Sequence, residues 1–233
     1  MRPTQETRDQ SVWDLAGNNV RYDDLYGKND SYFGSEPSRL LREKHGLLDR
    51  TGPVLDVGVG QGRNALFLAR KGFSVDAIDT SLVSIETVRS LAEREDLPIK
   101  TFHAGFARFC AEDRKYSGVL VLGLIQILSW EEISLLDQKA DEWTGAGGLL
   151  FITAFTTHDP SFAVSMNRLE KIGRNSFADE QGNVRTYLEP GEVLGIFGGF
   201  TPLHHWEGLG REHRHPDTPP ERHGMAEVVM RKM

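Results

Sequence analysis

The sequence predicts an α/β fold: a doubly wound, mostly parallel seven-stranded sheet that ends in a C-terminal antiparallel hairpin. After residue 50, short apolar runs alternate with longer stretches of helical periodicity. The runs are apolar throughout, which is typical of strands buried on both faces of a parallel sheet that helices cover. Near the C-terminus two strand-like runs follow each other with only an irregular connection between them, which favours an antiparallel pair. Because crossovers are right-handed, a doubly wound topology is expected for the rest.

Each element follows from local pattern. The polar first 50 residues end in an expected helix at 36–48, and strands are expected at 54–57, 73–79, 99–103, 118–122 and 149–154. A helix should begin near Arg63, and apolar residues three or four apart predict helices over 81–96 and 131–143. We therefore divide the chain into an N-terminal lid or helical segment, 1–50, and a second domain, 51–233.

The C-terminal third carries more irregular sequence. A short helix should start at Pro190, and the last two strands should cover 201–210 and 225–233, with a long connection between them. A second irregular stretch, 158–188, follows the fifth strand. An open α/β sheet binds its ligand at loops that follow the strands, so we expect the site at this edge of the sheet.

Composition limits the function. A formal net charge of −7 argues against a nucleic-acid partner and against an anionic membrane. There is no apolar run of membrane-spanning length and no apolar core of a signal peptide, which predicts a cytoplasmic protein. We expect a monomer or a homodimer. The single cysteine, Cys110, excludes an internal disulfide, fits a reducing compartment and is expected to fill space on an apolar helix face.

The stretch "VLDVGVGQGRNALFLARKGFSVDAID" is the most informative part of the chain. Gly58, Gly60 and Gly62 follow the first strand, where glycines permit a tight turn and a close approach of ligand to backbone. The following helix directs free N–H groups at that ligand. A dinucleotide motif would have its third glycine at the position of Arg63. Asp56, just before the loop, would repel a pyrophosphate and hold an ammonium group.

Asp79 ends the second strand, followed by Thr80, and is placed to accept hydrogen bonds from two ribose hydroxyls. An ammonium site, a ribose site and no phosphate site together indicate a nucleoside with an amino-acid tail. S-adenosylmethionine fits that description. We therefore expect it as the cofactor and methyl donor.

The residues "LDVGVGQGRN" and "VDAID", followed in order by "VLVLGLIQIL" and "GGLLFITAF", resemble the motifs of class I S-adenosylmethionine-dependent methyltransferases. The resemblance runs from about Pro53 to Met233 and implies a Rossmann-like methyltransferase fold. It implies that Asp56 faces the methionine amine, the three glycines line the tail and ribose, and Asp79 binds the ribose diol. Phe106 and Leu124 would flank the adenine and the sulfonium. One departure is Gly105, where many members of this class carry an acid that binds the adenine amino group.

More narrowly, "YFGSEPS", "GQGRNALFLARKGFSVDAID", "EHR" and "VVMRK" resemble the tellurite-resistance type of small-molecule methyltransferase. In that group a His-Arg pair between the last two strands faces the methyl donor. The resemblance implies His213 and Arg214 as the catalytic pair here. The family's loop lacks "HPDTPPERHG", which leaves the substrate open.

Several residues have two interpretations. Tyr32 and Phe33 either belong to a lid whose aromatic rings close over the donor or pack across the sheet edge. Arg174 and Arg185 are either surface charges or an anion grip. His213-x-His215 could bind a metal, but the sequence shows no cysteine or nearby cluster of carboxylates to complete the ligands, so we expect no metal.

The expected function is methyl transfer by direct displacement to a small-molecule acceptor, a chalcogen oxyanion or a thiol. Such soft nucleophiles need little help from a base, whereas an alcohol or amine would need one, and His213 is the candidate. The alternatives are a methyltransferase for a natural product or other small metabolite, a nicotinamide-dependent oxidoreductase, and a non-catalytic protein that binds the donor.

Overall fold

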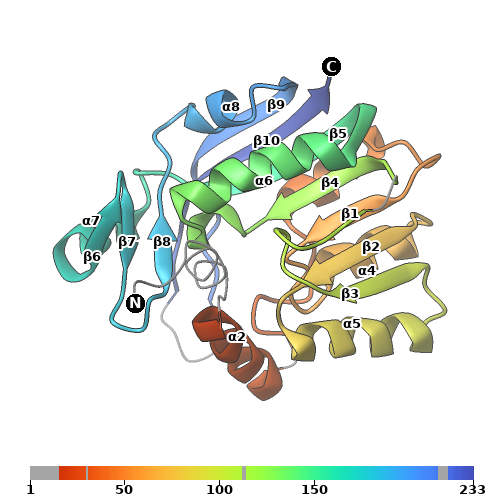
Figure 1. Cartoon of the computed structure of the whole chain (residues 1–233), viewed down its shortest axis with the longest axis horizontal. Helices are drawn as coiled ribbons and strands as arrows, with labels where there is room; N and C mark the ends of the chain where they lie inside the picture. The colour runs from red at the N-terminus through yellow and green to blue at the C-terminus, as the bar shows by residue number, and fades with distance from the viewer. Residues whose placement is uncertain (1–15, 30, 112–113, 215–219) are drawn as a thin grey trace, which may run out of the picture.

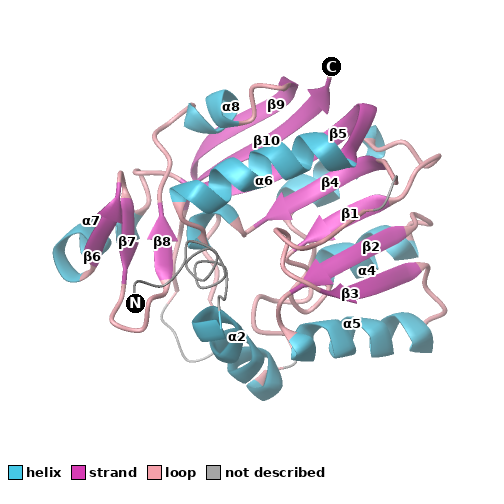
Figure 2. Cartoon of the chain, viewed as in Figure 1, coloured by secondary structure: helices cyan, strands magenta, loops and turns pink. Residues whose placement is uncertain are grey.

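The computed structural model describes residues 16–29, 31–111, 114–214 and 220–233, with side chains from residue 22 onward. Within these residues a seven-stranded sheet has the order β3-β2-β1-β4-β5-β10-β9 (Figures 1 and 2). Its strands are β1 (Val54–Val57), β2 (Val75–Asp79), β3 (Ile99–His103), β4 (Tyr116–Leu122), β5 (Thr144–Phe155), β9 (Phe200–Leu209) and β10 (Gly224–Lys232). The first five are parallel, and β10 pairs antiparallel with both β5 and β9. The predicted fold class is confirmed.

Helices cover both faces because the central strands alternate the face to which each apolar side chain points. Leu55 packs in one core cluster with α6 (Trp130–Trp143), which crosses in front of the sheet in Figure 1. Its neighbour Val54 packs in the other cluster, with α3 (Arg39–Lys44), α4 (Arg63–Arg70) and α5 (Leu82–Arg94). Ser81 caps α5, and Ser129 begins α6 in a capping box. The predicted helices are present with shifted ends.

The stretch 158–188, predicted to be irregular, is structured, so that prediction is wrong. It holds α7 (Pro160–Arg168) and a three-stranded antiparallel sheet of β6 (Glu170–Gly173), β7 (Ser176–Ala178) and β8 (Val184–Thr186). Asp159 caps α7 and Pro160 occupies its first turn. A small separate core of Phe155, Phe177 and Tyr187 holds the unit together. Strands of three or four residues are too short to produce a clear period in the sequence.

Two local expectations also change. The helix expected at 36–48 is divided into α3 and a 3-10 turn, η1 (His45–Leu47). Cys110 is exposed and follows β3 in a loop, so it does not fill space on a helix face. Phe106 and Phe109 of the same segment enter the core instead. The short helix expected from Pro190 is α8 (Glu192–Ile196).

The described part of the N-terminal segment begins with a helix near the carboxyl ends of the parallel strands (Figure 1). Helix α2 (Ala16–Lys28) contacts α5 there (Figure 1). Further along, Arg39 of α3 pairs with the buried Glu227 of β10 at 2.7 Å and stacks over Trp206. Helix α3 is thereby joined to the antiparallel part of the sheet. None of the described helices combines the length and apolar character that a membrane crossing requires.

Candidate active site

The glycine loop between β1 and α4 has a backbone that side chains would disturb. Gly62 has φ of 86° at the N-cap of α4, and a Cβ atom there would lie 2.8 Å from Cγ2 of Val88. Gly60 has φ of 54°, and its N–H donates to Oδ2 of Asp79 at 2.8 Å. The loop therefore holds its backbone against α5 and against the end of β2, and a ligand can approach it closely.

Asp79 is positioned by two backbone donors. Its Oδ1 accepts from the N–H of Ser81 at 2.8 Å, and its Oδ2 accepts from Gly60. Burial raises the pKa of Asp79, and these two N–H groups oppose the rise. Each carboxylate oxygen has a second lone pair, so the group can also accept hydrogen bonds from a pair of vicinal hydroxyls.

Asp56 is the buried acid of the site. It is 2% exposed, and its Oδ2 has no hydrogen-bond partner among the described residues. Burial, with a smaller contribution from Asp79, raises the pKa of Asp56 to about 7, although Arg63 and the N–H of Ala65 act in the opposite direction. An unpartnered buried carboxylate oxygen is costly, and an ammonium group is the ligand that would satisfy it.

Helix α2 closes over the glycine loop. Asp23 accepts hydrogen bonds from the hydroxyl of Ser81 and from the N–H of Val83, the latter at 3.3 Å. Tyr26 approaches the loop so closely that a Cβ atom at Gly60 would lie 3.2 Å from its hydroxyl oxygen. Burial raises the pKa of Tyr26, and the nearby Asp79 adds to the rise. Tyr26 therefore remains a neutral hydroxyl group above the donor loop.

Tyr32 and Phe33 lie beside the same loop. The N–H of Tyr32 donates to Oε1 of Gln61 at 2.7 Å, and the guanidinium of Arg63 donates to the carbonyl of Phe33 at 2.7 Å. The ring centroids of Tyr32 and Phe33 are 5.0 Å apart, and those of Tyr26 and Phe33 are 6.3 Å apart. The two predicted lid residues thus share an aromatic cluster with Tyr26 on the segment that covers the loop.

The other predicted donor contacts line the ends of β2, β3 and β4. Thr80 directly follows β2, and a Cβ atom at Gly105 would lie 3.2 Å from its Cγ2. Phe106 is 9% exposed and belongs to the core, so only its edge reaches the surface. A Cβ atom at Gly58 would lie 3.4 Å from Leu124. Leu124 therefore lies beside the glycine loop, and Thr80 lies beside Gly105.

The predicted catalytic pair lies on the hairpin loop beyond β9. His213 forms an antiparallel bridge with Glu221, and both His213 and Arg214 are exposed. The hairpin begins and ends at the edge of the sheet where β5 ends, because β10 starts opposite Phe155. His215, which was considered from the sequence with His213 as a metal ligand and set aside, lies outside the described residues.

The two arginines predicted from 158–188 have different surroundings. The guanidinium of Arg174 pairs with Glu192 and stacks 4.6 Å from the Trp130 ring. Arg185 lies 5.7 Å from the ring centroid of Phe155, on which His223 stacks at 4.2 Å. Only Arg185 is therefore connected to the hairpin loop that carries His213.

Gln126, Tyr26 and Asp23 were not singled out from the sequence. Gln126 follows β4, and its Oε1 is buried with no hydrogen-bond partner among the described residues. A buried amide oxygen of this kind can accept from a ligand amino group. The signal for Asp23 and Tyr26 was the polar, aromatic stretch "VRYDDLYG", in which these two residues are three apart and so share one face of a helix.

The site combines a parallel sheet that ends in an antiparallel hairpin with a glycine loop after β1 and acids near the ends of β1 and β2. These are the features of a class I S-adenosylmethionine-dependent methyltransferase. The model of the family described as "Tellurite resistance protein TehB" matches residues 46–211. The chain belongs to the TehB family.

Two curated relatives match parts of the chain. The chain is 28% identical over 152 residues to "Probable S-adenosyl-L-methionine-dependent methyltransferase TehB" of Haemophilus influenzae (strain 10810). The match covers 56% of this chain and 52% of that protein. A shorter match, 34% identical over 80 residues, to Hemagglutinin 1 of Eikenella corrodens covers 29% of this chain and 27% of that protein. The chain thus spans about half, or less, of the length of the curated relatives it matches.

Among solved structures, the crystal structure of TehB from Haemophilus influenzae superimposes with a TM-score of 0.65 and 21% identity. The superposition covers 91% of this chain and 67% of that chain. At this identity the likeness supports the fold.

Proposed function

We propose that the protein transfers a methyl group from S-adenosylmethionine to a small-molecule acceptor. The observation that carries the proposal is the buried, unpartnered Oδ2 of Asp56 beside a glycine loop that is itself bound to Asp79. A positively charged amino-acid tail and a ribose diol are the two ligand groups that such a pair of acids would accept. A pyrophosphate would be repelled by both.

The donor side is assigned as follows. Asp56 binds the ammonium group, and Asp79 accepts the ribose hydroxyls. Gly58, Gly60 and Gly62 let the tail and ribose approach the backbone. Thr80, Phe106 and Leu124 flank the adenine and the sulfonium. Gln126 offers an acceptor for a ligand N–H near the end of β4.

S-adenosylmethionine supplies an electrophilic methyl group, and displacement at that carbon needs alignment more than proton transfer. The chain's own residues provide alignment: two fixed acids hold the donor, and the lid segment with Tyr26, Tyr32 and Phe33 excludes water above it. Orientation of this kind contributes on the order of 7–11 kcal/mol to lowering a barrier. The neutral Tyr26 side chain is compatible with a nearby cationic sulfonium, because the face of its aromatic ring attracts cations.

We propose a thiol or a chalcogen oxyanion as the acceptor. Support comes from membership of a family described by tellurite resistance, and from His213 and Arg214 on the hairpin loop, which can orient an anion. Arg185 contacts the ring of Phe155, and His223 of the same loop stacks on that ring. Arg185 is therefore a third candidate for contact with an anionic acceptor.

The test is an acceptor screen with methyl-labelled donor, covering tellurite, selenite, small thiols and phenols. We expect labelled product with a thiol or a chalcogen oxyanion, and a His213→Ala variant that turns over more slowly while its donor affinity stays nearly unchanged. Donor binding without transfer to any acceptor would instead identify a non-catalytic donor-binding protein. Reduction of a nicotinamide cofactor would identify an oxidoreductase.

A further inference from the structure

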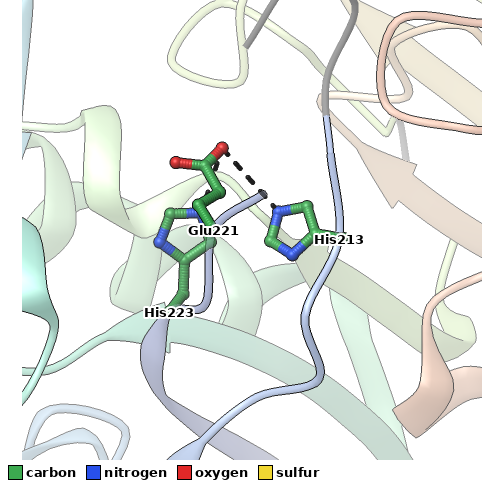
Figure 3. A group of neighbouring side chains, drawn as sticks. All are labelled: His213, Glu221 and His223. Atoms are coloured by element: carbon green, nitrogen blue, oxygen red, sulfur yellow. Dashed lines mark ion pairs between the residues drawn. The ribbon is translucent and has the colours of Figure 1, made fainter. Parts of the chain in front are cut away.

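Three potential metal ligands converge on the hairpin loop between β9 and β10. His213 and Glu221 face each other across an antiparallel bridge, with backbone hydrogen bonds of 3.0 Å and 2.8 Å in the two directions. His223 is two residues beyond Glu221, which places both side chains on one face of the extended chain. Figure 3 shows the three side chains directed toward one another from the two strands of the loop.

The ligand atoms are close to metal-binding distances before any ion is bound. Nε2 of His213 lies 4.0 Å from Oε1 of Glu221, and Nε2 of His223 lies 3.9 Å from the same oxygen. One ligand atom from each residue can be chosen so that all three lie within 4.8 Å of one another. Ligands bound to a tetrahedral zinc ion at about 2.0–2.1 Å lie about 3.4 Å apart, so a small inward movement completes the geometry.

A buried carboxylate orients one of the imidazoles. Nδ1 of His223 lies 2.9 Å from Oδ2 of Asp159, whose side chain is 1% exposed. Because Nδ1 contacts this carboxylate, Nε2 is the ring nitrogen left facing Glu221, 3.9 Å from its Oε1. This carboxylate–histidine arrangement is the usual outer support of a metal-bound histidine.

Packing restricts the His223 ring further. It stacks on Phe155 with centroids 4.2 Å apart and planes 24° apart, and the His213 ring centroid lies 5.0 Å from it. The ring is therefore held by a hydrogen bond on one edge and an aromatic face. Restricted side chains lose little entropy when an ion binds.

We propose that His213, Glu221 and His223 form a binding site for one divalent transition-metal ion of the Zn²⁺ type, with Asp159 as the positioning residue of His223. Two imidazoles and one carboxylate suit such an ion better than Mg²⁺ or Ca²⁺, which prefer oxygen ligands. Three protein ligands leave one tetrahedral position open, as in catalytic rather than structural zinc sites. A cavity of about 420 Å³, lined in part by Glu221, His223 and Asp159, lies beside the group and admits a fourth ligand.

The metal site is tested separately from the proposed methyl transfer, although both proposals involve His213. In the metal-bound protein His213 is a ligand. The sequence-based expectation of no metal counted only His213 and His215 and did not anticipate Glu221 and His223.

The test is calorimetric titration of the chelator-treated full chain with Zn²⁺ alone, with neither donor nor acceptor present. We expect the wild type to bind one equivalent of Zn²⁺. Glu221→Gln and His213→Ala should each weaken that binding about 100-fold or more. This exceeds the loss of about 10–100-fold that removal of an outer partner causes. The matched control is His205→Ala, because His205 pairs with Glu207 at 2.9 Å on β9 but belongs to no three-ligand group among the described residues. It should bind Zn²⁺ as the wild type does.

Asp159→Asn tests the positioning role. It keeps all three ligands, so it should weaken Zn²⁺ binding by about 10–100-fold without abolishing it, provided that circular dichroism shows a wild-type fold. Absence of stoichiometric binding to the folded wild type, or equal binding by wild type, Glu221→Gln and His213→Ala, would overturn the proposal. Because the readout is metal binding, failure of the methyl-transfer proposal would leave it untouched.

Discussion

Replacing Asp56 with Asn should stabilise the ligand-free protein while it weakens donor binding. The rise of the Asp56 pKa from 3.8 to about 7 corresponds to about 4 kcal/mol by which the ionised group destabilises the fold at higher pH. Asn removes the charge but leaves one amide group without a partner, which costs about 1–3 kcal/mol. The net gain in unfolding free energy is about 1–3 kcal/mol. For a chain of this length that raises Tm by about 2–12 °C.

The gain should depend on pH in a defined direction. The folded state holds the Asp56 proton more tightly than the unfolded state. The contribution of this group to the free energy of unfolding is therefore complete below pH 3.8 and is lost as pH rises through about 7. Between about pH 5 and about pH 8 the variant should gain about 2–3 kcal/mol relative to wild type. Denaturant unfolding at the two pH values measures this difference.

Donor binding should move in the opposite direction. The ammonium group selects ionised Asp56, so wild-type affinity for S-adenosylmethionine should rise with pH, at most tenfold for each pH unit, and level off above about pH 7. Asp56→Asn should bind about 10–100-fold more weakly and lose this dependence. Isothermal titration calorimetry measures both.

A matched control is Asp76→Asn on β2. Asp76 is also a buried acid, and one of its oxygens has no partner among the described residues, but the other accepts from Arg114 at 2.7 Å and from Tyr116 at 2.9 Å. Its replacement should lower stability and leave donor affinity unchanged. The reasoning is refuted if Asp56→Asn is less stable than wild type at high pH and binds the donor as tightly.

Three further predictions concern the same site. Asp79→Ala removes the acceptor for the ribose diol and for the Gly60 N–H, so donor affinity should fall about 100-fold or more, and an unchanged calorimetric affinity would contradict the assignment. Gly62→Ala combines a left-handed φ with a clash against Val88 and should cost about 1–3 kcal/mol in denaturant unfolding. Adding Val88→Ala should recover only the part due to the clash, and full recovery would argue against backbone strain. Asp23→Ala should release α2 and speed limited proteolysis of residues 22–33, whereas a wild-type cleavage rate would speak against a lid held by this residue.

The sheet and the positions of Asp56 and Asp79 were predictable, because both depend on local sequence. Val54–Val57 is buried at every position, and a short run of Val, Leu and Val with one acid, directly before glycines, indicates such a strand. Asp56 and Asp79 are then placed by the register of two adjacent parallel strands, in which Asp56 lies opposite Ala77. The donor-binding roles proposed for the two acids follow from these positions.

The group on the hairpin loop was not predictable in the same way. Pairing His213 with Glu221 requires the register of a loop whose middle lies outside the described residues, and supporting His223 with Asp159 joins residues 64 apart. The small sheet after α7 was missed for a related reason. Its strands are three or four residues long, and its core includes Phe155 from another sheet.

The most direct test of the central claim is a crystal structure of the protein with S-adenosylmethionine. The account predicts the ammonium group within hydrogen-bonding distance of Asp56 Oδ2, the ribose hydroxyls on Asp79, and the lid segment closed above them. A donor bound elsewhere, or a pyrophosphate-containing nucleotide that occupies the glycine loop in preference to it, would contradict the account.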